Sequence, residues 1–342
     1  MTSLNAAIIG CGAIHRNHVD ALRLLPDVDL RAIADVDTPK GEHLAQRYGC
    51  RFYRDYQEML LAHDIDVVHI CTPHYLHKPM IMAALAAGKH VFSEKPVAMS
   101  GGDIAEIRHA AYASTGRLGV CYQNRVNPTS QTIDALLTAG TLGEMHSIKA
   151  ILTWSRGDAY YRDSDWRGWF ATEGGSLLIN QAIHTLDLMQ WFGGGVRRVK
   201  GVVDNATLNE VTEAEDSAMA TFEFHNGARG LFYASNAHVT DSPLLLEIHC
   251  QHGTLRLQDN ILWLLTGDGQ RELARDTAPD GGKSYWGTGH QQAIAHFYHA
   301  LRHPTADGVM DLDAAACSLQ LVEAIYRSSQ LRRWINLTDV ID

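Results

Sequence analysis

The first third of the 342-residue chain alternates short apolar, strand-like runs with amphipathic, helix-like runs. Such alternation implies parallel strands joined by right-handed helical crossovers, which together make a doubly wound α/β sheet. The expected strands cover residues 6–9, 30–34, 66–71, 91–92 and 118–122. The helices between them are expected at residues 13–25, 77–87 and 102–114.

The pattern changes near residue 125, where long strand-like segments begin to dominate. A helix is expected at 129–139 and a strand at 145–154, and further strands follow between 196 and 265. Asn226-Gly227 indicates a hairpin, because both central residues of such a turn need positive φ. Two closing helices are expected at the following residues: 291–301 and 312–331. We therefore expect two domains, 1–124 (doubly wound) and 125–342 (α+β), the second an open, mainly antiparallel sheet with flanking helices. Packing of the second domain's C-terminal helix against the first domain is compatible with this division.

Charge and cysteine usage exclude several classes of protein. There are 29 basic and 39 acidic side chains, a formal net charge of −10, which argues against nucleic acid as a partner. No apolar run approaches the ~20 residues that span a bilayer, so no membrane partner is expected. The first residues, 1–5, lack the cationic start of a secretory signal. The six cysteines are scattered without a C-x-x-C pair, so we expect a cytoplasmic protein without disulfides.

A glycine turn connects the first strand to the first helix. Gly10 permits the tight turn, and Gly12 lets the backbone approach a pyrophosphate that the helix N-terminus then binds. Ala13, Ile14 and His15 open that helix. The third position of this motif is usually Gly or Ala, so His15 departs from it, and we expect its ring to point toward the phosphates.

A carboxylate ends the second strand, 25 residues after Gly10. Asp35 there can accept hydrogen bonds from the adenosine ribose of a dinucleotide, although a solvated strand-end residue is the alternative. It would repel the 2′-phosphate of NADP, as would Asp37, and no arginine follows immediately to receive that phosphate. NAD is therefore the expected cofactor, in preference to NADP.

Four segments together resemble the Gfo/Idh/MocA-like oxidoreductase family, which includes glucose–fructose oxidoreductase and inositol dehydrogenase. They are the glycine turn 10–14 with His18, Thr72–His77, Ala87–Pro96 with its E-K-P sequence, and Gly174–Asp187. The resemblance implies a Rossmann domain, a C-terminal sheet that forms a homodimer or homotetramer, and a nicotinamide between the domains. It also implies hydride transfer between NAD and a secondary hydroxyl of a sugar, polyol or sugar derivative.

The same resemblance assigns roles to individual residues. Lys95 would stabilise the reacting oxygen, and His184 would be the acid/base, for which an imidazole with an ordinary pKa near ~6.5 is suited. Asn180, four residues earlier on the expected helix, would position the substrate, because an amide cannot relay a proton. The inositol dehydrogenase branch has aspartate there, which weakens a claim for myo-inositol. Beside the glycine turn and Asp35, the expected cofactor contacts are Thr72, Pro73, His77, Glu94 and Lys95.

Each of these residues also has a structural alternative. Lys95 could be a surface lysine paired with Glu94, and a lone helix histidine such as His184 is most often structural. For Asp187 a structural role is the stronger expectation.

Aromatic, arginine and amide side chains are the expected substrate contacts, since flat rings stack on sugar C–H surfaces. A solvent-exposed loop with an aromatic anchor is the alternative. The arginines leave room for an anionic sugar. No metal is expected, although three histidines at 296, 299 and 303 share a helical stripe. The expected contacts are Arg125, Asn127, Tyr161, Trp166, Arg167, Asn180, His184 and Trp286.

Two other functions remain open from the sequence. One is a glycosidase of the same fold that retains NAD and acts by transient oxidation and elimination. The other is a non-catalytic regulator that senses NAD, against which the presence of both Lys95 and His184 argues.

Overall fold

The computed structural model describes residues 3–277, 288–303 and 310–340. The chain divides into two compact units. The first contains Met1–Gln123 and His290–Ala316, and the second contains Asn124–Gly289 and Cys317–Asp342. None of the described helices is both long and apolar enough to cross a membrane.

The first unit is built on a six-stranded parallel sheet in the order β3-β2-β1-β4-β5-β6. The chain reverses its direction of travel across the sheet between β1 and β4, and open α/β sheets bind ligands at such a point. This confirms the doubly wound sheet. The strands are β1 (Leu4–Ile9), β2 (Val28–Ala34), β3 (Arg51–Tyr53), β4 (Val67–Ile70), β5 (His90–Glu94) and β6 (Leu118–Cys121).

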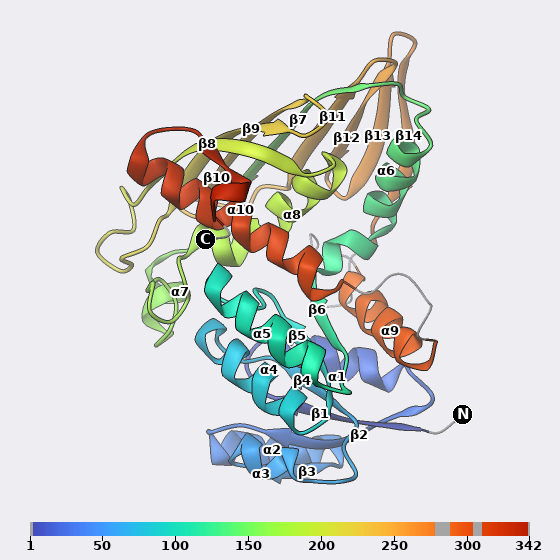
Figure 1. The fold of residues 1–342 in the computed structure, drawn as a ribbon, viewed down its shortest axis with the longest axis vertical. Helices are drawn as coiled ribbons and strands as arrows, with labels where there is room; N and C mark the ends of the chain where they lie inside the picture. The colour runs from blue at the N-terminus through green and yellow to red at the C-terminus, as the bar shows by residue number, and fades with distance from the viewer. Residues whose placement is uncertain (1–2, 278–287, 304–309, 341–342) are drawn as a thin grey trace. The chain divides into compact units, whose positions relative to one another are not determined.

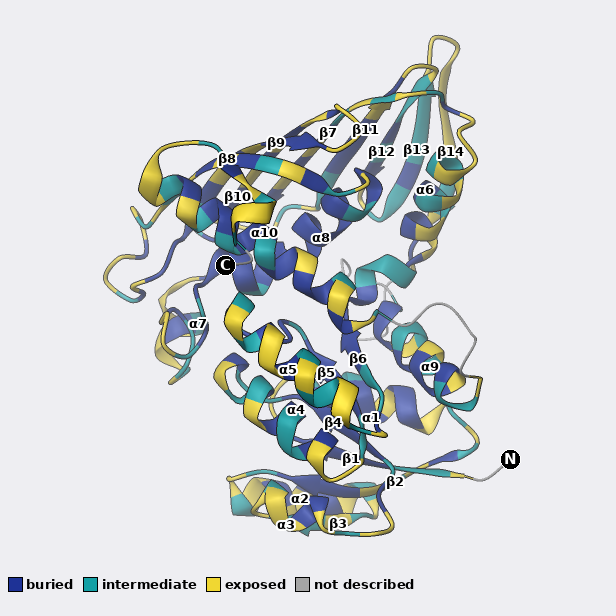
Figure 2. Cartoon of the chain, viewed as in Figure 1, coloured by how far each residue is buried: buried dark blue, intermediate teal, exposed yellow. Residues whose placement is uncertain are grey.

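Helices surround this sheet, and its strands are mostly buried (Figures 1 and 2). Phe297 and Tyr298, from a helix near the C-terminus, belong to the core of this unit, together with Ile8 and Phe92. The chain therefore returns to its first unit after completing most of the second. The helices are α1 (His15–Arg23), α2 (Thr38–Tyr48), α3 (Tyr56–Leu60), α4 (His77–Ala86), α5 (Gly101–Ala113) and α9 (Gly289–Arg302), with the short η1 (His74–Leu76).

The second unit contains a nine-stranded sheet in the order β14-β13-β12-β11-β7-β10-β9-β8-β15. Every pairing is antiparallel except that of β7 with β10, so the expectation of a mainly antiparallel sheet is confirmed. The strands are β7 (Met145–Thr153), β8 (Val196–Asp204), β9 (Ser217–Phe224), β10 (Arg229–Ser235), β11 (Leu245–Cys250), β12 (Gly253–Gln258), β13 (Ile261–Thr266), β14 (Gly269–Arg275) and β15 (Ile335–Asn336).

Side chains alternate between the two faces of this sheet. Phe232 on β10 is buried, whereas its neighbours Leu231 and Tyr233 are exposed, as the two-residue period of a strand requires. Figure 1 shows α8 on one face of the sheet. The predicted hairpin joins β9 to β10, but the expectation of positive φ at both turn residues is wrong, because Gly227 has a φ of +88° and Asn226 does not have a positive φ. The turn is longer than two residues, since the Phe224 N–H donates to the Ala228 carbonyl at its base. The helical segments are α6 (Pro128–Thr138), α7 (Asp158–Arg162), α8 (Ile183–Phe192) and α10 (Leu312–Leu331), with the short η2 (Gln123–Val126), the π-helix η3 (Leu177–Ala182) and η5 (Leu337–Val340).

Candidate functional site

The two glycines of the turn after β1 differ in their surroundings: Gly10 is closely packed, whereas Gly12 borders open space. Gly10 has a φ of +91°, and a Cβ there would lie 2.8 Å from both the Cys71 carbonyl oxygen and Thr72 Cγ2. A Cβ on Gly12 would meet nothing nearer than the Cys71 oxygen at 4.0 Å. Among the described residues no side chain caps the N-terminus of α1. Its first N–H groups are therefore suited to bind a phosphate.

The carboxylate of Asp35 is fixed opposite this turn. One oxygen accepts a hydrogen bond from the backbone N–H of Cys11 at 2.6 Å, and the other accepts one from that of Asp37 at 2.9 Å. The ammonium of Lys40 lies 3.5 Å from it. The carboxylate is thus fixed at the end of β2, where the ribose of a dinucleotide is held in folds of this kind.

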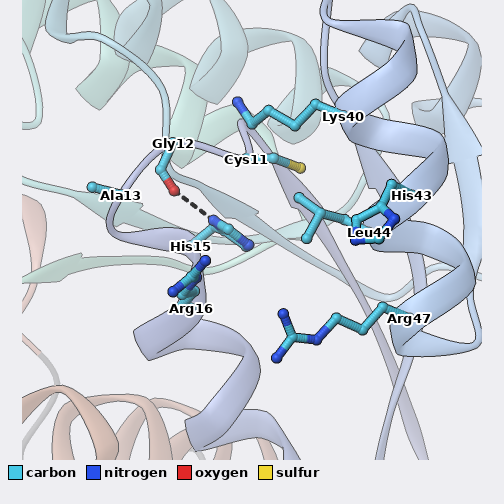
Figure 3. A pocket seen from close by; sticks show the side chains of 9 residues that line it. All are labelled: Cys11, Gly12, Ala13, His15, Arg16, Lys40, His43, Leu44 and Arg47. Atoms are coloured by element: carbon cyan, nitrogen blue, oxygen red, sulfur yellow. Dashed lines mark hydrogen bonds between the residues drawn. The ribbon is translucent and has the colours of Figure 1, made fainter. Parts of the chain in front are cut away.

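A cavity of about 520 Å³ lies between the glycine turn and α2 (Figure 3). Ala13 is exposed and lines this cavity, and the next residue, Ile14, is half-buried. Three cationic side chains and two imidazoles surround the cavity, which suits an anionic ligand. The residues present therefore fit a bound dinucleotide. The lining residues are Cys11, Gly12, Ala13, His15, Arg16, Lys40, His43, Leu44 and Arg47.

His15 is tied to the turn it follows. Its Nδ1 lies 2.5 Å from the carbonyl oxygen of Gly12, and its Nε2 lies 2.9 Å from the hydroxyl of Tyr48. Burial lowers the pKa of the ring, which keeps it neutral near pH 7. The ring therefore braces the glycine turn against α2, where the sequence led us to expect a phosphate-facing side chain.

Lys95 follows directly after β5, at the carboxyl end of the parallel sheet, and is half-buried. Its backbone N–H donates to Glu94 Oε2 at 3.3 Å. The other oxygen of Glu94 lies 3.1 Å from Nε2 of His18 and 3.3 Å from Nε2 of His290. Burial would raise the pKa of Glu94, but the hydrogen bonds from these two imidazoles hold it well below its ordinary value. Glu94 is thus an ionised anchor for the segment that carries Lys95.

Two further expected cofactor contacts, Thr72 and His77, lie close to this segment. His77 is buried, with Nδ1 2.6 Å from the Pro96 carbonyl oxygen and Nε2 2.8 Å from that of Thr72. It therefore links the loop after β4, which contains Thr72 and Pro73, to the loop after β5. Both loops lie at the ligand-binding edge of the sheet.

In the second unit, Asn180 and His184 lie on either side of a change in helix type. Asn180 is in the π-helix η3, and His184 is the second residue of α8. We predicted one regular helix across both, but the wider π turn changes the angle between their side chains. Single π turns inside helices occur frequently at functional sites.

The carboxyl of Glu173, which the sequence analysis did not single out, contacts Asn180. Asn180 Nδ2 donates to Glu173 Oε1 at 2.5 Å, and the Gly168 N–H donates to Oε2 at 2.5 Å. The side chain is fully buried, and burial raises its pKa to about 7. Neighbouring Glu215 raises it further, whereas the two hydrogen bonds and Arg167 oppose the rise.

This raised pKa predicts an unusual dependence of stability on pH. Because the folded protein holds the Glu173 proton more tightly than the unfolded chain does, its contribution is complete below pH 4.5 and is lost as the pH rises to about 7. Relative to Glu173→Gln, the free energy of unfolding of the wild type should fall by at most about 3 kcal/mol across that window. Urea denaturation of both proteins at several pH values measures the difference, and a difference that is constant with pH would refute this ionisation.

Arg167 and Trp166 form a stacked group with Tyr160. The guanidinium carbon of Arg167 lies 4.3 Å from the centroid of the Tyr160 ring and 5.1 Å from that of Trp166. The Tyr160 hydroxyl also accepts a hydrogen bond from Gln181 at 3.0 Å. Tyr161 is buried, and its hydroxyl pairs with Ser176. Tyr161 thus supports the turn before η3, while the group around Arg167 offers a flat, cationic surface.

Arg125 has a partner inside the protein. Its guanidinium makes two hydrogen bonds of 2.8 Å to the buried carboxylate of Asp187, which also accepts one from the hydroxyl of Ser318. Asn127 is buried beside a cavity of about 30 Å³, which has room for about one water molecule. The remaining expected contact, Trp286, lies outside the described residues.

Sequence reasoning missed Glu173 and Tyr160 as neighbours of Asn180. Glu173 directly precedes the Gly174–Asp187 segment, so its place beside a functional segment was the available signal. Nothing in the spacing shows that a carboxyl seven residues before an amide returns to it, because the turn that brings them together depends on Gly174 at φ +83° and Gly175 at φ +145°.

Two family models match the chain. A model described as "Oxidoreductase family, NAD-binding Rossmann fold" matches residues 4–122, and one described as "GFO/IDH/MocA C-terminal domain" matches residues 130–256. Together they cover all six strands of the first sheet and β7 to β11 of the second.

Characterised relatives match over almost the whole chain. D-glucoside 3-dehydrogenase of Escherichia coli is 28% identical and covers 96% of this chain and 97% of its own. D-apiose dehydrogenase of Paraburkholderia graminis is 28% identical, covering 97% of this chain and 89% of its own. The structure of the WlbA dehydrogenase of Bordetella pertussis, in complex with NADH and UDP-GlcNAcA, has a TM-score of 0.87 at 27% identity and covers 98% of both chains. Taken with the two sheets and with the cavity beside the glycine turn and Asp35, these matches show that the chain belongs to the GFO/IDH/MocA family of NAD-binding oxidoreductases.

Proposed function

We propose that this protein is an NAD-dependent dehydrogenase of a sugar, polyol or sugar derivative, and that it acts on a secondary hydroxyl. The observation that carries this most is the fixed Asp35 carboxylate facing the glycine turn at the end of the sheet on which Lys95 lies. The dehydrogenases of glucosides and apiose support the substrate class.

Oxidation of an alcohol requires that the hydroxyl loses a proton while its carbon loses a hydride. NAD, when bound, accepts the hydride. Lys95, carried by the segment that Glu94 anchors, donates a hydrogen bond to the reacting oxygen and stabilises its developing negative charge. His184, in the first turn of α8, takes the proton. Asn180 binds a substrate hydroxyl and so orients the carbon.

The cationic surface around Arg167 favours a substrate that carries negative charge. A guanidinium stacked on Tyr160 and Trp166 keeps its donors in a plane that matches a carboxylate or phosphate. WlbA, with UDP-GlcNAcA bound, is a relative whose ligand contains both groups. We therefore include acidic and nucleotide-linked sugars among the candidate substrates.

A substrate panel tests this function directly. The purified protein is incubated with NAD and, in turn, methyl glucosides, D-apiose, levoglucosan, myo-inositol and UDP-N-acetylglucosaminuronic acid, while NADH absorbance and product release are followed together. We expect stoichiometric NADH with at least one sugar. Glycoside cleavage without accumulated NADH would indicate the NAD-retaining glycosidase, and tight NAD binding without any turnover would indicate a sensor.

The choice between NAD and NADP should depend on the charge of Asp35. Asp35→Asn keeps the shape and one acceptor for the Cys11 N–H but removes the negative charge that repels a 2′-phosphate. Arg16, Lys40 and Arg47 line the same cavity and would then favour that phosphate. We expect the ratio of the Kd for NADP to the Kd for NAD to fall by at least about tenfold, since charged hydrogen bonds contribute roughly 1.5–3 kcal/mol. Titration calorimetry with each cofactor measures the ratio, and an unchanged ratio would refute the role of Asp35.

We also propose that the protein assembles as a homodimer or homotetramer through the exposed face of the nine-stranded sheet. Val202, Met219, Tyr233 and Ile151 are neighbours across four adjacent strands and are 53%, 55%, 36% and 37% exposed. Apolar side chains gathered in this way on a surface mark an interaction site. The six cysteines all lie in the described residues and form no disulfide, which supports a cytoplasmic location.

A charge on this face should weaken the assembly. Met219→Lys places an ammonium in the middle of the apolar row, where docking a second sheet would desolvate it. We expect sedimentation velocity to show a shift toward monomer at micromolar concentration. Val239→Lys is the matched control, because Val239 is 95% exposed but lies outside the sheet. An equal effect of both variants, or of neither, would refute this interface.

A further inference from the structure

The amide of Asn180 has two N–H groups, and both face acceptors. Nδ2 lies 2.5 Å from Glu173 Oε1 and 3.5 Å from the hydroxyl of Tyr160. An ionised carboxylate can only accept hydrogen bonds, so the nitrogen of the amide, and not its oxygen, must face Glu173. The orientation of Asn180 therefore follows from the charge of its neighbour.

We propose that Glu173 is a positioning residue for the reaction, which holds Asn180 so that the amide presents Oδ1 as an acceptor to the substrate hydroxyl. This proposal rests on the proposed function, in which Asn180 binds that hydroxyl. Glu173 acts through Asn180 and not on the substrate itself.

The position of Glu173 is itself fixed. Its second oxygen accepts the backbone N–H of Gly168 at 2.5 Å, and this donor cannot exchange places with an acceptor. A glutamine at position 173 would have to turn its oxygen toward Gly168 and its NH₂ toward Asn180. Glu173→Gln should therefore invert the Asn180 amide with almost no change in volume.

Glu215 is a second buried carboxyl beside the same turn, with a different task. It accepts hydrogen bonds from the backbone N–H groups of Leu178 at 2.8 Å and Ser176 at 3.3 Å, at the start of η3. Glu215 thus holds the backbone of the π-helix, whereas Glu173 holds a side chain on it. This contrast makes Glu215 a matched control.

The charge state of Glu173 also makes the orientation sensitive to pH. The titratable and charged groups around it are Arg167, Glu215, Tyr160, Tyr161 and Tyr326. Burial among them raises its pKa to about 7. Above that pH the carboxylate allows one orientation of Asn180. Below it, the protonated carboxyl can also donate to the amide oxygen, so substrate affinity should fall as the pH drops.

A double-mutant cycle tests the proposal in the full-length protein. Wild type, Glu173→Gln, Asn180→Ala and the double variant are compared for kcat and KM with the panel sugar that gives the highest NADH yield. We expect Glu173→Gln to raise KM about tenfold, equivalent to the loss of one oriented hydrogen bond, and to change KM less than about twofold when Asn180 is already alanine. Glu215→Gln should lower the Tm. Its effect on KM should be the same whether residue 180 is asparagine or alanine, so position 215 should show no coupling to Asn180. A tenfold effect in both backgrounds would show that Glu173 is merely structural.

The dependence of KM on pH gives a second test that needs no substitution of Glu173. KM of the wild type should rise below about pH 7, and Asn180→Ala should lose that rise. A rise that survives in Asn180→Ala would overturn the proposal, even if Glu173→Gln failed to fold.

A measurement without turnover separates this proposal from the proposed function. In protein labelled with ¹⁵N at asparagine, the side-chain NH₂ signals that disappear in Asn180→Ala belong to Asn180. They should shift with a midpoint near pH 7 in the wild type and not in Glu173→Gln. If no panel sugar is oxidised but these signals titrate as described, the substrate proposal fails and the coupling stands. If they do not titrate, the coupling fails.

Discussion

Replacing Lys95 by methionine is expected to lower kcat about a thousandfold while the affinity for NAD changes less than about threefold. Methionine keeps the length of the side chain and removes the ammonium that stabilises the developing alkoxide, and loss of one such donor costs roughly 10²–10³ in rate. The anchor beneath it remains, because Glu94 holds the backbone N–H of residue 95 and pairs with His18 and His290 whatever the side chain is.

Steady-state kinetics and calorimetric NAD binding measure these two quantities. Lys78→Met is the matched control, because Lys78 pairs with Asp103 and Glu106 on the surface of the same unit. That variant should retain the wild-type kcat. If Lys95→Met kept kcat within about twofold, the assignment of Lys95 to the reacting oxygen would be wrong.

The second large effect is expected from His184→Asn, which should lower kcat by about 10²–10⁴, the usual contribution of a positioned acid/base. An imidazole that accepts a proton must be neutral, so the wild-type oxidation rate should fall as acid protonates it. In the variant the plateau that the wild-type rate reaches once the imidazole is neutral should disappear, and the remaining rate should increase with hydroxide concentration. The asparagine keeps a polar side chain of similar reach on α8 and cannot take up a proton.

Rate–pH profiles of the two proteins measure this effect. His225→Asn is a control in the same unit, since His225 is exposed next to the β9–β10 turn. Its profile should match that of the wild type. An unchanged profile in His184→Asn would assign the proton transfer to another group.

The fold was predictable because it depends on local patterns. Alternating strand and helix runs determine the parallel sheet. The Asn226-Gly227 sequence marked the β9–β10 hairpin correctly, although the turn is longer than two residues and only Gly227 has a positive φ. The return of Phe297 and Tyr298 to the first core was harder to predict, because an apolar helix face does not indicate which of two cores it covers.

Side-chain roles were less predictable, because they depend on contacts that are distant in the sequence. Arg125 meets Asp187 across 62 residues, and Glu94 meets His290 across nearly 200, so neither pairing follows from spacing. The prediction of one regular α-helix through Asn180 and His184 is wrong, because it assumes 3.6 residues per turn and η3 is a π-helix with a wider turn. The positions of Lys95 and His184 in the sequence indicated their importance only through the family resemblance.

The most direct test of hydride transfer from a sugar to NAD uses deuterium. The panel sugar that is oxidised is supplied with deuterium in place of the hydrogens on its carbon atoms. The cofactor is then recovered, and its mass is measured by mass spectrometry. We predict NADH that carries one deuterium for each sugar oxidised, formed far more slowly by Lys95→Met and His184→Asn than by the wild type. Product formed without a matching amount of labelled NADH in solution would contradict the account.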